Sequence, residues 1–369
     1  MTTSRFKVSI PSERLEPQKF NGDLKEGRFH GTGVLQYQNG SVYKGEFVNG
    51  QQEGFGCYEL ADGSIYEGHF RANRYHGSGT LRFASGNVFT GNWVEGRIMG
   101  KGQLVFANKD SFEGDWTDGM MNGEGVYRFA TGDTYKGAWV SDKRHGHGLM
   151  TYVEGEAYEG KWENDQISGW GKYTYADGGI YEGDWLSGKM TGKGTFRFSN
   201  GSEYSGDWLD DHRHGFGSLK YANGDKYEGA WLEGRPHGKG VFTYQDGTTY
   251  TGAYESSLKQ GRGEMRFSNG DVFNGEFAED QANGYGVCEY HDGSRYEGMW
   301  KNDFRHGKGL LTIGSEIWEG EFADNRRDGR GTLKLAGGVE ITGVWKVGNF
   351  KQCLELKLPE GSPWTDPDA

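Results

Sequence analysis

Short stretches in which large apolar residues and glycines alternate with polar residues return along the chain with a period of 23 residues. A typical stretch has an aromatic residue, a glycine two residues later and a second aromatic two residues after that, as in Tyr181, Gly183 and Trp185. With the first of these residues as position 1, the repeats begin at Phe20, Tyr43, Tyr66, Phe89, Phe112, Tyr135, Tyr158, Tyr181, Tyr204, Tyr227, Tyr250, Phe273, Tyr296, Trp318 and Ile341. Self-similarity at such a period predicts stacked supersecondary units.

The parity of these positions predicts β-strands. Positions 1, 3 and 5 lie two residues apart, as do positions 12, 14, 16 and 18, so each set occupies one face of an extended strand. Position 16 is apolar throughout, whereas positions 2, 4, 15 and 17 are mostly polar, which is typical of a hairpin with one face in solvent. We expect residues 302–307 to form a connection between the strands of a hairpin, and residues 39–41 to form a turn that leads to the next hairpin.

Glycine fills position 3 in all fifteen repeats, and positions 12 and 14 in all fourteen complete ones. Glycine ordinarily weakens a strand. We expect the absent Cβ atoms to make room for the rings at positions 1 and 5, because aromatic cover offsets the cost of a strand glycine. An alanine at Gly183 or Gly194 is then expected to displace Trp185 or a neighbouring ring.

The predicted fold is all-β: an elongated, twisted, open antiparallel sheet of about 14–15 stacked 23-residue hairpins. Residues 1–19 are expected to form an N-terminal segment with a cap strand at Arg5–Ile10. Residues 20–349 hold fifteen repeats, the last of them partial. Residues 350–369 are expected to form a C-terminal cap around Leu354–Leu358, followed by an acidic tail that contains proline.

The motif Tyr-x-Gly-x-Trp, followed by His-Gly-x-Gly, is carried by Tyr227–Trp231 and His237–Gly240. With its recurrence over residues 20–349, this pattern resembles the MORN (membrane occupation and recognition nexus) repeat family. The resemblance implies stacked β-hairpins in an elongated, often dimeric scaffold. A chain made almost wholly of repeats is similar to the cytoskeletal MORN proteins of unicellular parasites. That similarity implies cytoskeletal protein partners and a basal-body, flagellar or cortical location.

Composition limits the partners and the cellular compartment that we expect for the protein. The 369 residues carry a net charge of −12, which opposes non-specific attraction to nucleic acid, so no nucleic-acid partner is expected. Three cysteines, Cys57, Cys288 and Cys353, are too few for a disulfide framework, and no apolar leader or 18-residue apolar stretch occurs. A reducing, cytoplasmic setting is expected.

We expect no enzymatic activity and no cofactor, because the G-x-S-x-G, Walker, H-E-x-x-H and kinase motifs are absent from the sequence. Cys288 and His291 have the spacing C-x-x-H, but Cys288 occupies the apolar position 16 and is interpreted as a core residue. No metal site is therefore expected. The alternative is a zinc ion shared across a dimer contact with Cys353 or His306.

Basic residues gather at positions 9 and 10, and stacking is expected to turn them into a stripe along the hairpin loops. The residues are Arg28, Arg74, Arg97, Lys143, Arg144, Lys189, Arg213, Arg235, Lys259, Arg305, Arg326 and Arg327. One interpretation is a solvated surface that prevents aggregation. The other is a multivalent binding surface for phosphoinositide headgroups or acidic partner segments.

The C-terminal repeats depart from the pattern by placing extra aliphatic and aromatic groups near the sheet end. These residues are Ile313, Trp318, Ile341, Val344, Trp345, Val347 and Phe350, and they predict the contact of a homodimer. A capped monomer is the alternative. The sequence thus predicts a non-enzymatic cytoskeletal scaffold that self-associates and binds proteins. The second hypothesis is a phosphoinositide-binding adapter that tethers membrane to the cytoskeleton.

Overall fold

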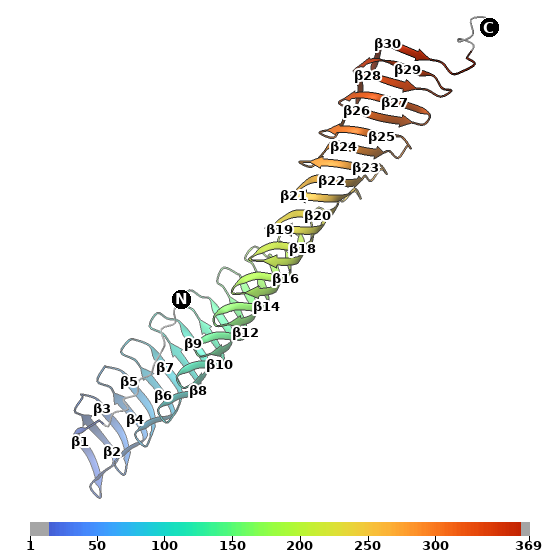
Figure 1. The fold of residues 1–369 in the computed structure, drawn as a ribbon. Coiled ribbons are helices and arrows are strands. Elements are labelled where there is room, and N and C mark those ends of the chain that lie inside the picture. Colours follow the sequence, from blue (N-terminus) through green and yellow to red (C-terminus); the bar gives the residue numbers. More distant parts are fainter. Residues whose placement is uncertain (1–14, 363–369) are drawn as a thin grey trace. The chain divides into compact units, whose positions relative to one another are not determined.

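The structure, a computed structural model, describes residues 15–362, which divide into two units at Lys189 and Met190. In the first unit the strands lie side by side in chain order (Figure 1). They are β1 (Pro17–Lys25), β2 (Arg28–Tyr37), β3 (Val42–Val48), β4 (Gln51–Glu59), β5 (Ile65–Arg71), β6 (Arg74–Arg82), β7 (Val88–Val94), β8 (Arg97–Val105), β9 (Ser111–Thr117), β10 (Met120–Arg128), β11 (Thr134–Val140), β12 (Lys143–Thr151), β13 (Ala157–Glu163), β14 (Gln166–Thr174) and β15 (Ile180–Leu186).

The second unit continues the same arrangement, and its first strand begins at the last residue of the first unit. Its strands are β16 (Lys189–Arg197), β17 (Glu203–Leu209), β18 (His212–Lys220), β19 (Lys226–Leu232), β20 (Arg235–Thr243), β21 (Thr249–Glu255), β22 (Leu258–Arg266), β23 (Val272–Ala278), β24 (Gln281–Glu289), β25 (Arg295–Lys301), β26 (Phe304–Ile313), β27 (Glu316–Ala323), β28 (Arg326–Lys334), β29 (Glu340–Lys346) and β30 (Asn349–Lys357). All pairings within each unit are antiparallel between chain neighbours, and the sheet is open, which confirms the predicted all-β class.

Each repeat contributes a seven- or eight-residue strand, a tight turn and a second strand of nine or ten residues, except that β1 has nine residues. The turn occupies only positions 7 and 8, both with positive φ, as at Asn302 (φ 50°) and Asp303 (φ 67°). Two left-handed residues are the signature of a type I′ hairpin turn, whose twist matches that of the strands. The prediction of a connection over residues 302–307 was therefore too long, because Phe304–Gly307 already belong to β26.

The glycines at positions 3 and 14 pair across neighbouring strands, as in Gly56–Gly68 and Gly68–Gly79. The ring at position 1 lies over these pairs. A Cβ atom on Gly68 would lie 2.7 Å from the Tyr66 hydroxyl oxygen and 2.5 Å from the Cα atom of Gly79. The predicted vacancy for a ring is confirmed at these two positions.

The glycine at position 12 is required for a different reason, which is its backbone conformation. Gly77 has a φ of +63°. A Cβ atom added to Gly77 would have the Cβ atom of His69 as its nearest neighbour, at 3.6 Å. Gly77 lies at the register shift between the Gly68–Gly79 and Phe70–Tyr75 pairs, where β6 carries extra residues. A bulge that needs left-handed backbone favours glycine for its conformation. The expectation that position 12 is vacated for a ring was wrong.

The buried face of each unit is a row of aromatic rings in edge-to-face contact. The Tyr135 ring is fully buried and lies 5.2 Å from the Trp139 ring of its own repeat and 5.3 Å from the Trp162 ring of the next. Their polar atoms bond to backbone: Tyr135 donates to the Ala138 carbonyl, and Trp162 Nε1 donates to the Gly148 carbonyl. The pattern couples each repeat to its neighbour within the unit.

The two sheet ends differ from the interior strands. The predicted N-terminal cap strand at Arg5–Ile10 lies outside the described residues, as do the last seven residues of the predicted tail. At the other end, Leu354–Lys357 form part of β30, which pairs with β29 and with no second strand in the described range. Residues 15–362 contain no helix with the length and hydropathy needed to cross a membrane.

Candidate functional site

The predicted basic stripe is divided between the two faces of the sheet. Neighbouring residues of a strand point to opposite faces, so positions 9 and 10 are separated. The position-9 cations are exposed, and they are Arg28, Arg74, Arg97, Lys143, Lys189, Arg235 and Arg326. The position-10 cations are half-buried over the aromatic face, and they are Arg144, Arg213, Lys259, Arg305 and Arg327. A single surface made of all twelve cations, as the sequence interpretation assumed, is therefore not formed.

Two of the exposed cations at position 9 form ion pairs with the next repeat. Arg74 lies 3.4 Å from Glu95, and Arg97 lies 3.1 Å from Asp118. Exposed pairs of this kind add little to stability and are screened by salt. They do lower the net positive charge that this column presents to a ligand.

The position-10 cations are stacked on rings. The Arg213 guanidinium carbon lies 4.5 Å from the Trp231 ring centroid, and Nη2 donates to the Gly234 carbonyl at 2.7 Å. Burial lowers the pKa of the Arg213 guanidinium. Lys259 lies 5.4 Å from the Tyr250 centroid, and its ammonium donates to the Tyr244 hydroxyl at 3.1 Å. Stacking and hydrogen bonds fix these charges over an apolar surface.

The backbone at position 10 also joins successive hairpin turns. In several repeats its N–H donates to the side-chain oxygen of an Asp or Asn at position 8 of the next repeat. Arg144 N donates to Asp165 at 3.0 Å, and Lys259 N donates to Asp280 at 2.8 Å. At Pro236 this bond is absent because proline has no N–H, and the next turn carries Ser257 instead of Asp or Asn. The Ser257 N–H donates to the Pro236 carbonyl at 3.0 Å.

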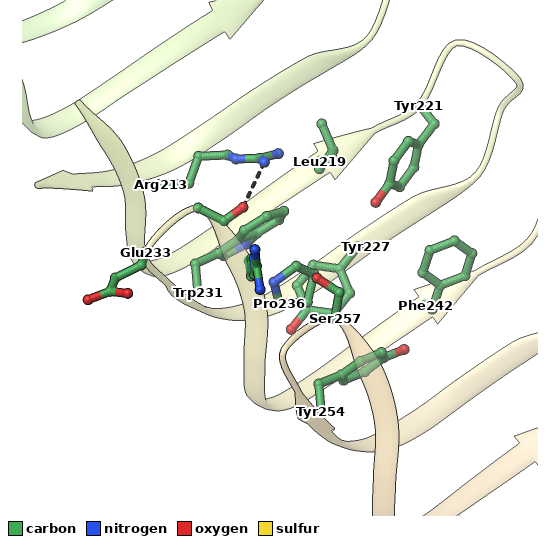
Figure 2. A pocket seen from close by; sticks show the side chains of 12 residues that line it. Arg213, Leu219, Tyr221, Tyr227, Trp231, Glu233, Pro236, Phe242, Tyr254 and Ser257 are labelled. Atoms are coloured by element: carbon green, nitrogen blue, oxygen red, sulfur yellow. Dashed lines mark hydrogen bonds between the residues drawn. The ribbon is translucent and has the colours of Figure 1, made fainter. Parts of the chain in front are cut away.

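A pocket of about 460 Å³ opens beside Pro236 on the aromatic face of the second unit (Figure 2). Its walls combine rings with one stacked guanidinium, and the residues that form most of them are Arg213, Tyr221, Tyr227, Trp231, Phe242 and Tyr254. Arg213 is one of the predicted site residues, whereas the pocket was not predicted. The available signal was the short Pro236 at a position that usually carries a long side chain.

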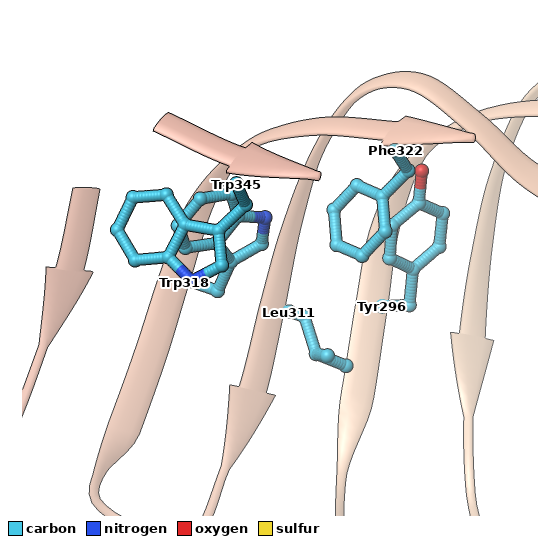
Figure 3. Close-up of a cluster of buried hydrophobic side chains, with 5 residues drawn as sticks. All are labelled: Tyr296, Leu311, Trp318, Phe322 and Trp345. Carbon is cyan, nitrogen blue, oxygen red and sulfur yellow. The ribbon is translucent and has the colours of Figure 1, made fainter. Parts of the chain in front are cut away.

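The residues predicted for a dimer contact fall into two sets. Trp318 and Trp345 are buried in one cluster with Tyr296, Leu311 and Phe322, and their ring centroids are 4.3 Å apart (Figure 3). Ile341 is partly buried against this cluster, and Val344 is half-buried. The remaining three residues are exposed: Ile313, Val347 and Phe350.

Cys288 and His291 are separated by their burial. Cys288 is 4% exposed in β24, as the interpretation as a core residue predicted, and burial raises its thiol pKa. His291 is an exposed turn residue whose Nδ1 lies 2.9 Å from Asp271 Oδ1. In residues 15–362 no group of three or more His, Cys, Asp or Glu side chains is placed to hold a metal ion.

Comparison with solved structures gives, among others, two likenesses of low TM-score. The TCP10 domain of Danio rerio CPAP in complex with a STIL peptide is 12% identical, and the match covers 70% of this chain and 94% of that one at a TM-score of 0.28. The Drosophila melanogaster SAS-4 TCP domain, in complex with a proline-rich motif of Ana2, is 17% identical. That match covers 42% of this chain and 85% of the other chain, at a TM-score of 0.28. At these TM-scores the likenesses support no conclusion about function.

Comparison of the sequence itself is decisive. No curated protein matches it. The MORN repeat model matches fourteen successive segments, at residues 20–42, 43–65, 66–88, 89–111, 112–134, 135–156, 158–180, 181–203, 204–226, 227–249, 250–272, 273–295, 296–315 and 318–339. These segments fall on the hairpins described above, and they indicate a repeat scaffold of the kind that binds proteins or membranes. The chain belongs to the MORN repeat family.

Proposed function

We propose that this protein is a non-enzymatic structural scaffold of the cytoskeleton that self-associates and binds protein partners along its stacked hairpins. The main support is the succession of fourteen MORN repeats along the chain. Equivalent positions recur on equivalent strands, so a unit offers several similar contacts to one partner. Several weak contacts of matching spacing gain avidity. A cytoplasmic location on a basal-body, flagellar or cortical structure belongs to this proposal.

Proximity labelling and detergent extraction of the tagged protein in its own cell test the cytoskeletal role. We expect most of the protein to stay with the insoluble cytoskeleton after non-ionic detergent, and labelled neighbours to be cytoskeletal proteins. Complete release by detergent, with no cytoskeletal neighbour labelled, would contradict the proposal. A fragment that ends before residue 190 provides a comparison for the contribution of the second unit.

Self-association is proposed to use the exposed apolar residues near β30. Val347 and Phe350 are 46% and 48% exposed, and β30 is an edge strand of the described sheet. Unpaired edges are prone to pair with another chain. Light scattering of the full chain is expected to give a dimer mass, and the double variant Val347→Lys, Phe350→Lys a monomer mass. Val94→Lys is the matched control, because Val94 is 48% exposed but lies in the first unit. An unchanged mass for the double variant would place the contact elsewhere.

The second candidate function is phosphoinositide binding through the position-9 column. Arg74 and Arg97 are exposed at equivalent positions of consecutive repeats, where a phosphate could replace their partners Glu95 and Asp118. Co-sedimentation with phosphatidylinositol 4,5-bisphosphate vesicles at low salt is the test, with phosphatidylcholine vesicles as control. Binding that is lost in the variant Arg74→Glu, Arg97→Glu would support the adapter. Failure of the wild-type protein to sediment would refute it.

A further inference from the structure

We propose that the pocket beside Pro236 is a binding site for an acidic peptide segment of a partner protein, and that it takes one ring-bearing side chain of that segment with a neighbouring carboxylate on Arg213. The inference rests on the proposed partner-binding function and specifies where on the chain one such contact is made.

The side chain at position 10 of this repeat, Pro236, is short and lines the pocket. Pro236 pairs with Trp231 across β19 and β20. In most other repeats position 10 holds a longer side chain, as in Met121 and Met190, which are 4% and 8% exposed and so fill the corresponding place, although Ala282 is also short. Pro236 leaves that volume open, between the Trp231 ring of its own repeat and the Tyr254 ring of the next.

The walls of the pocket suit an aromatic or large apolar side chain. Tyr221, Tyr227, Phe242 and Tyr254 surround the opening, and a volume of about 460 Å³ lies within the range of small-ligand sites. Among the described residues the Tyr254 hydroxyl is buried without a hydrogen-bond partner. A buried hydroxyl left unpaired is costly. An acceptor atom of a ligand that reached Tyr254 would remove this cost.

The charges at the pocket favour an acidic ligand. Arg213 contributes a positive charge to the lining on the aromatic face, whereas Arg235 and Glu233 line the pocket from position 9 and from the hairpin turn. Arg213 is held by the Trp231 ring and by one hydrogen bond to Gly234, while a guanidinium has five N–H donors. A carboxylate can therefore accept from Arg213 without breaking the bond to Gly234. Aromatic rings alone would attract a cationic ligand. Here the positive charge of Arg213 repels such a ligand.

A peptide fits this arrangement better than a lipid headgroup. An inositol polyphosphate needs several converging cations, whereas here five of the twelve lining residues are aromatic and Glu233 adds a negative charge. Cations of the same column continue on the aromatic face of the second unit at Lys259 and Arg305. Alternate repeats are about 19 Å apart at 4.8 Å per strand, so acidic residues about six positions apart in an extended segment would match them.

The probe for the test is the blocked peptide acetyl-Glu-Asp-Phe-Glu-Asp-amide, titrated calorimetrically into the full chain at low salt. The comparison peptide is acetyl-Gln-Asn-Phe-Gln-Asn-amide. We expect the acidic peptide to bind about tenfold more tightly, because a charge-assisted hydrogen bond contributes roughly that factor. Arg213→Gln is expected to remove the difference. Arg305→Gln is the matched control, since Arg305 is stacked in the same way on Tyr296, 5.6 Å away, but does not line the pocket.

Pro236→Met fills the pocket with the residue that this chain uses at the same position in two other repeats. Loss of peptide binding in Pro236→Met, with an unchanged thermal midpoint, supports the site. Equal binding of both peptides, or binding that survives Pro236→Met, overturns it. Inositol 1,4,5-trisphosphate is the third probe, and if it binds in an Arg213-dependent way while the acidic peptide does not, the ligand is a phosphate and the peptide proposal fails. Detergent extraction of Pro236→Met separates the two proposals, because the scaffold role holds if the variant stays with the cytoskeleton, whatever the peptides do.

Discussion

The ring of Tyr227 covers Gly240 so closely that a Cβ atom on Gly240 would lie 2.5 Å from the Tyr227 hydroxyl oxygen. The same hydroxyl donates to the Ala230 carbonyl at 2.9 Å, so it is fixed in this place. Tyr227 is fully buried. The ring therefore cannot move away from a methyl group added beneath it without breaking its hydrogen bond to Ala230.

Gly240→Ala is therefore expected to destabilise the second unit by about 1–3 kcal/mol through overpacking. Urea unfolding followed by tryptophan fluorescence measures the change. The double variant Tyr227→Leu, Gly240→Ala should lose less than the sum of the two single variants, because the smaller side chain leaves room for the methyl group. Additive losses would show that the ring does not cause the conflict.

At Gly238, two residues earlier, we expect substitutions by alanine and asparagine to rank in the opposite order of their cost in stability. Its φ is +69°, and an added Cβ would approach only the Cβ atom of Ala230, at 3.5 Å. Asparagine tolerates left-handed backbone better than alanine does, so Gly238→Asn should cost less than Gly238→Ala. At Gly240 the larger asparagine should cost more than alanine. Unfolding free energies of the four variants test this reversal, and the same order at both sites would contradict it.

These two glycines show what could be predicted from sequence. Alternation predicted the strands and the ring above Gly240, because the pleat determines which residues share a face. The bulge at Gly238 was missed, since it depends on register: β20 has three residues between Pro236 and Gly240 where β19 has one between Gly229 and Trp231. Periodicity alone does not distinguish a glycine needed for space from one needed for its backbone.

The candidate site was harder to predict. Strand parity would have separated Arg213 from its neighbour His212, yet positions 9 and 10 were treated as one stripe. The pocket depends on the relative sizes of side chains from different strands, with Pro236 short and Trp231 and Tyr254 long. Such a difference is visible only once the repeats are stacked in register.

Asp165 is expected to hold two successive hairpin turns together. It accepts from the Arg144 backbone N–H at 3.0 Å and from Arg144 Nε at 3.1 Å. Asp165→Ala should cost about 1–3 kcal/mol and speed exchange of the Arg144 amide hydrogen, because that N–H loses its partner. Asp165→Asn is the matched control, as Asn73 and Asn325 accept the same bond in other repeats. Equal losses in both variants would exclude the hydrogen bond as the cause.

The ion pair of His291 with Asp271 is expected to make stability depend on pH. Its hydrogen bond to Asp271 raises the His291 pKa above the ordinary 6.5. When the pKa of a group is higher in the folded protein than in the unfolded chain, the group stabilises the fold. This contribution is complete at a pH below the unfolded pKa, and it is lost as the pH rises through the folded pKa. The difference in thermal midpoint between wild type and His291→Asn should therefore be fully present well below pH 6.5 and disappear as pH rises through the raised folded pKa. A difference that persists unchanged at alkaline pH would show that the charge is not involved.

Variants of Trp345 and Trp318 test whether these two residues belong to the core of one chain or to a contact between two chains. Both were predicted at a dimer contact, and both are buried, at 4% and 0% exposure. Trp345→Ala should cost about 3–5 kcal/mol, as the loss of a large buried ring does. Trp318→Phe should cost less, because it removes an indole N–H that has no hydrogen-bond partner in the described residues along with part of the ring. Urea unfolding and light scattering on the same samples check this, since core residues change the unfolding free energy at any protein concentration. If Trp345→Ala instead halved the molecular mass and left the stability of the monomer unchanged, the two tryptophans would be contacts between chains.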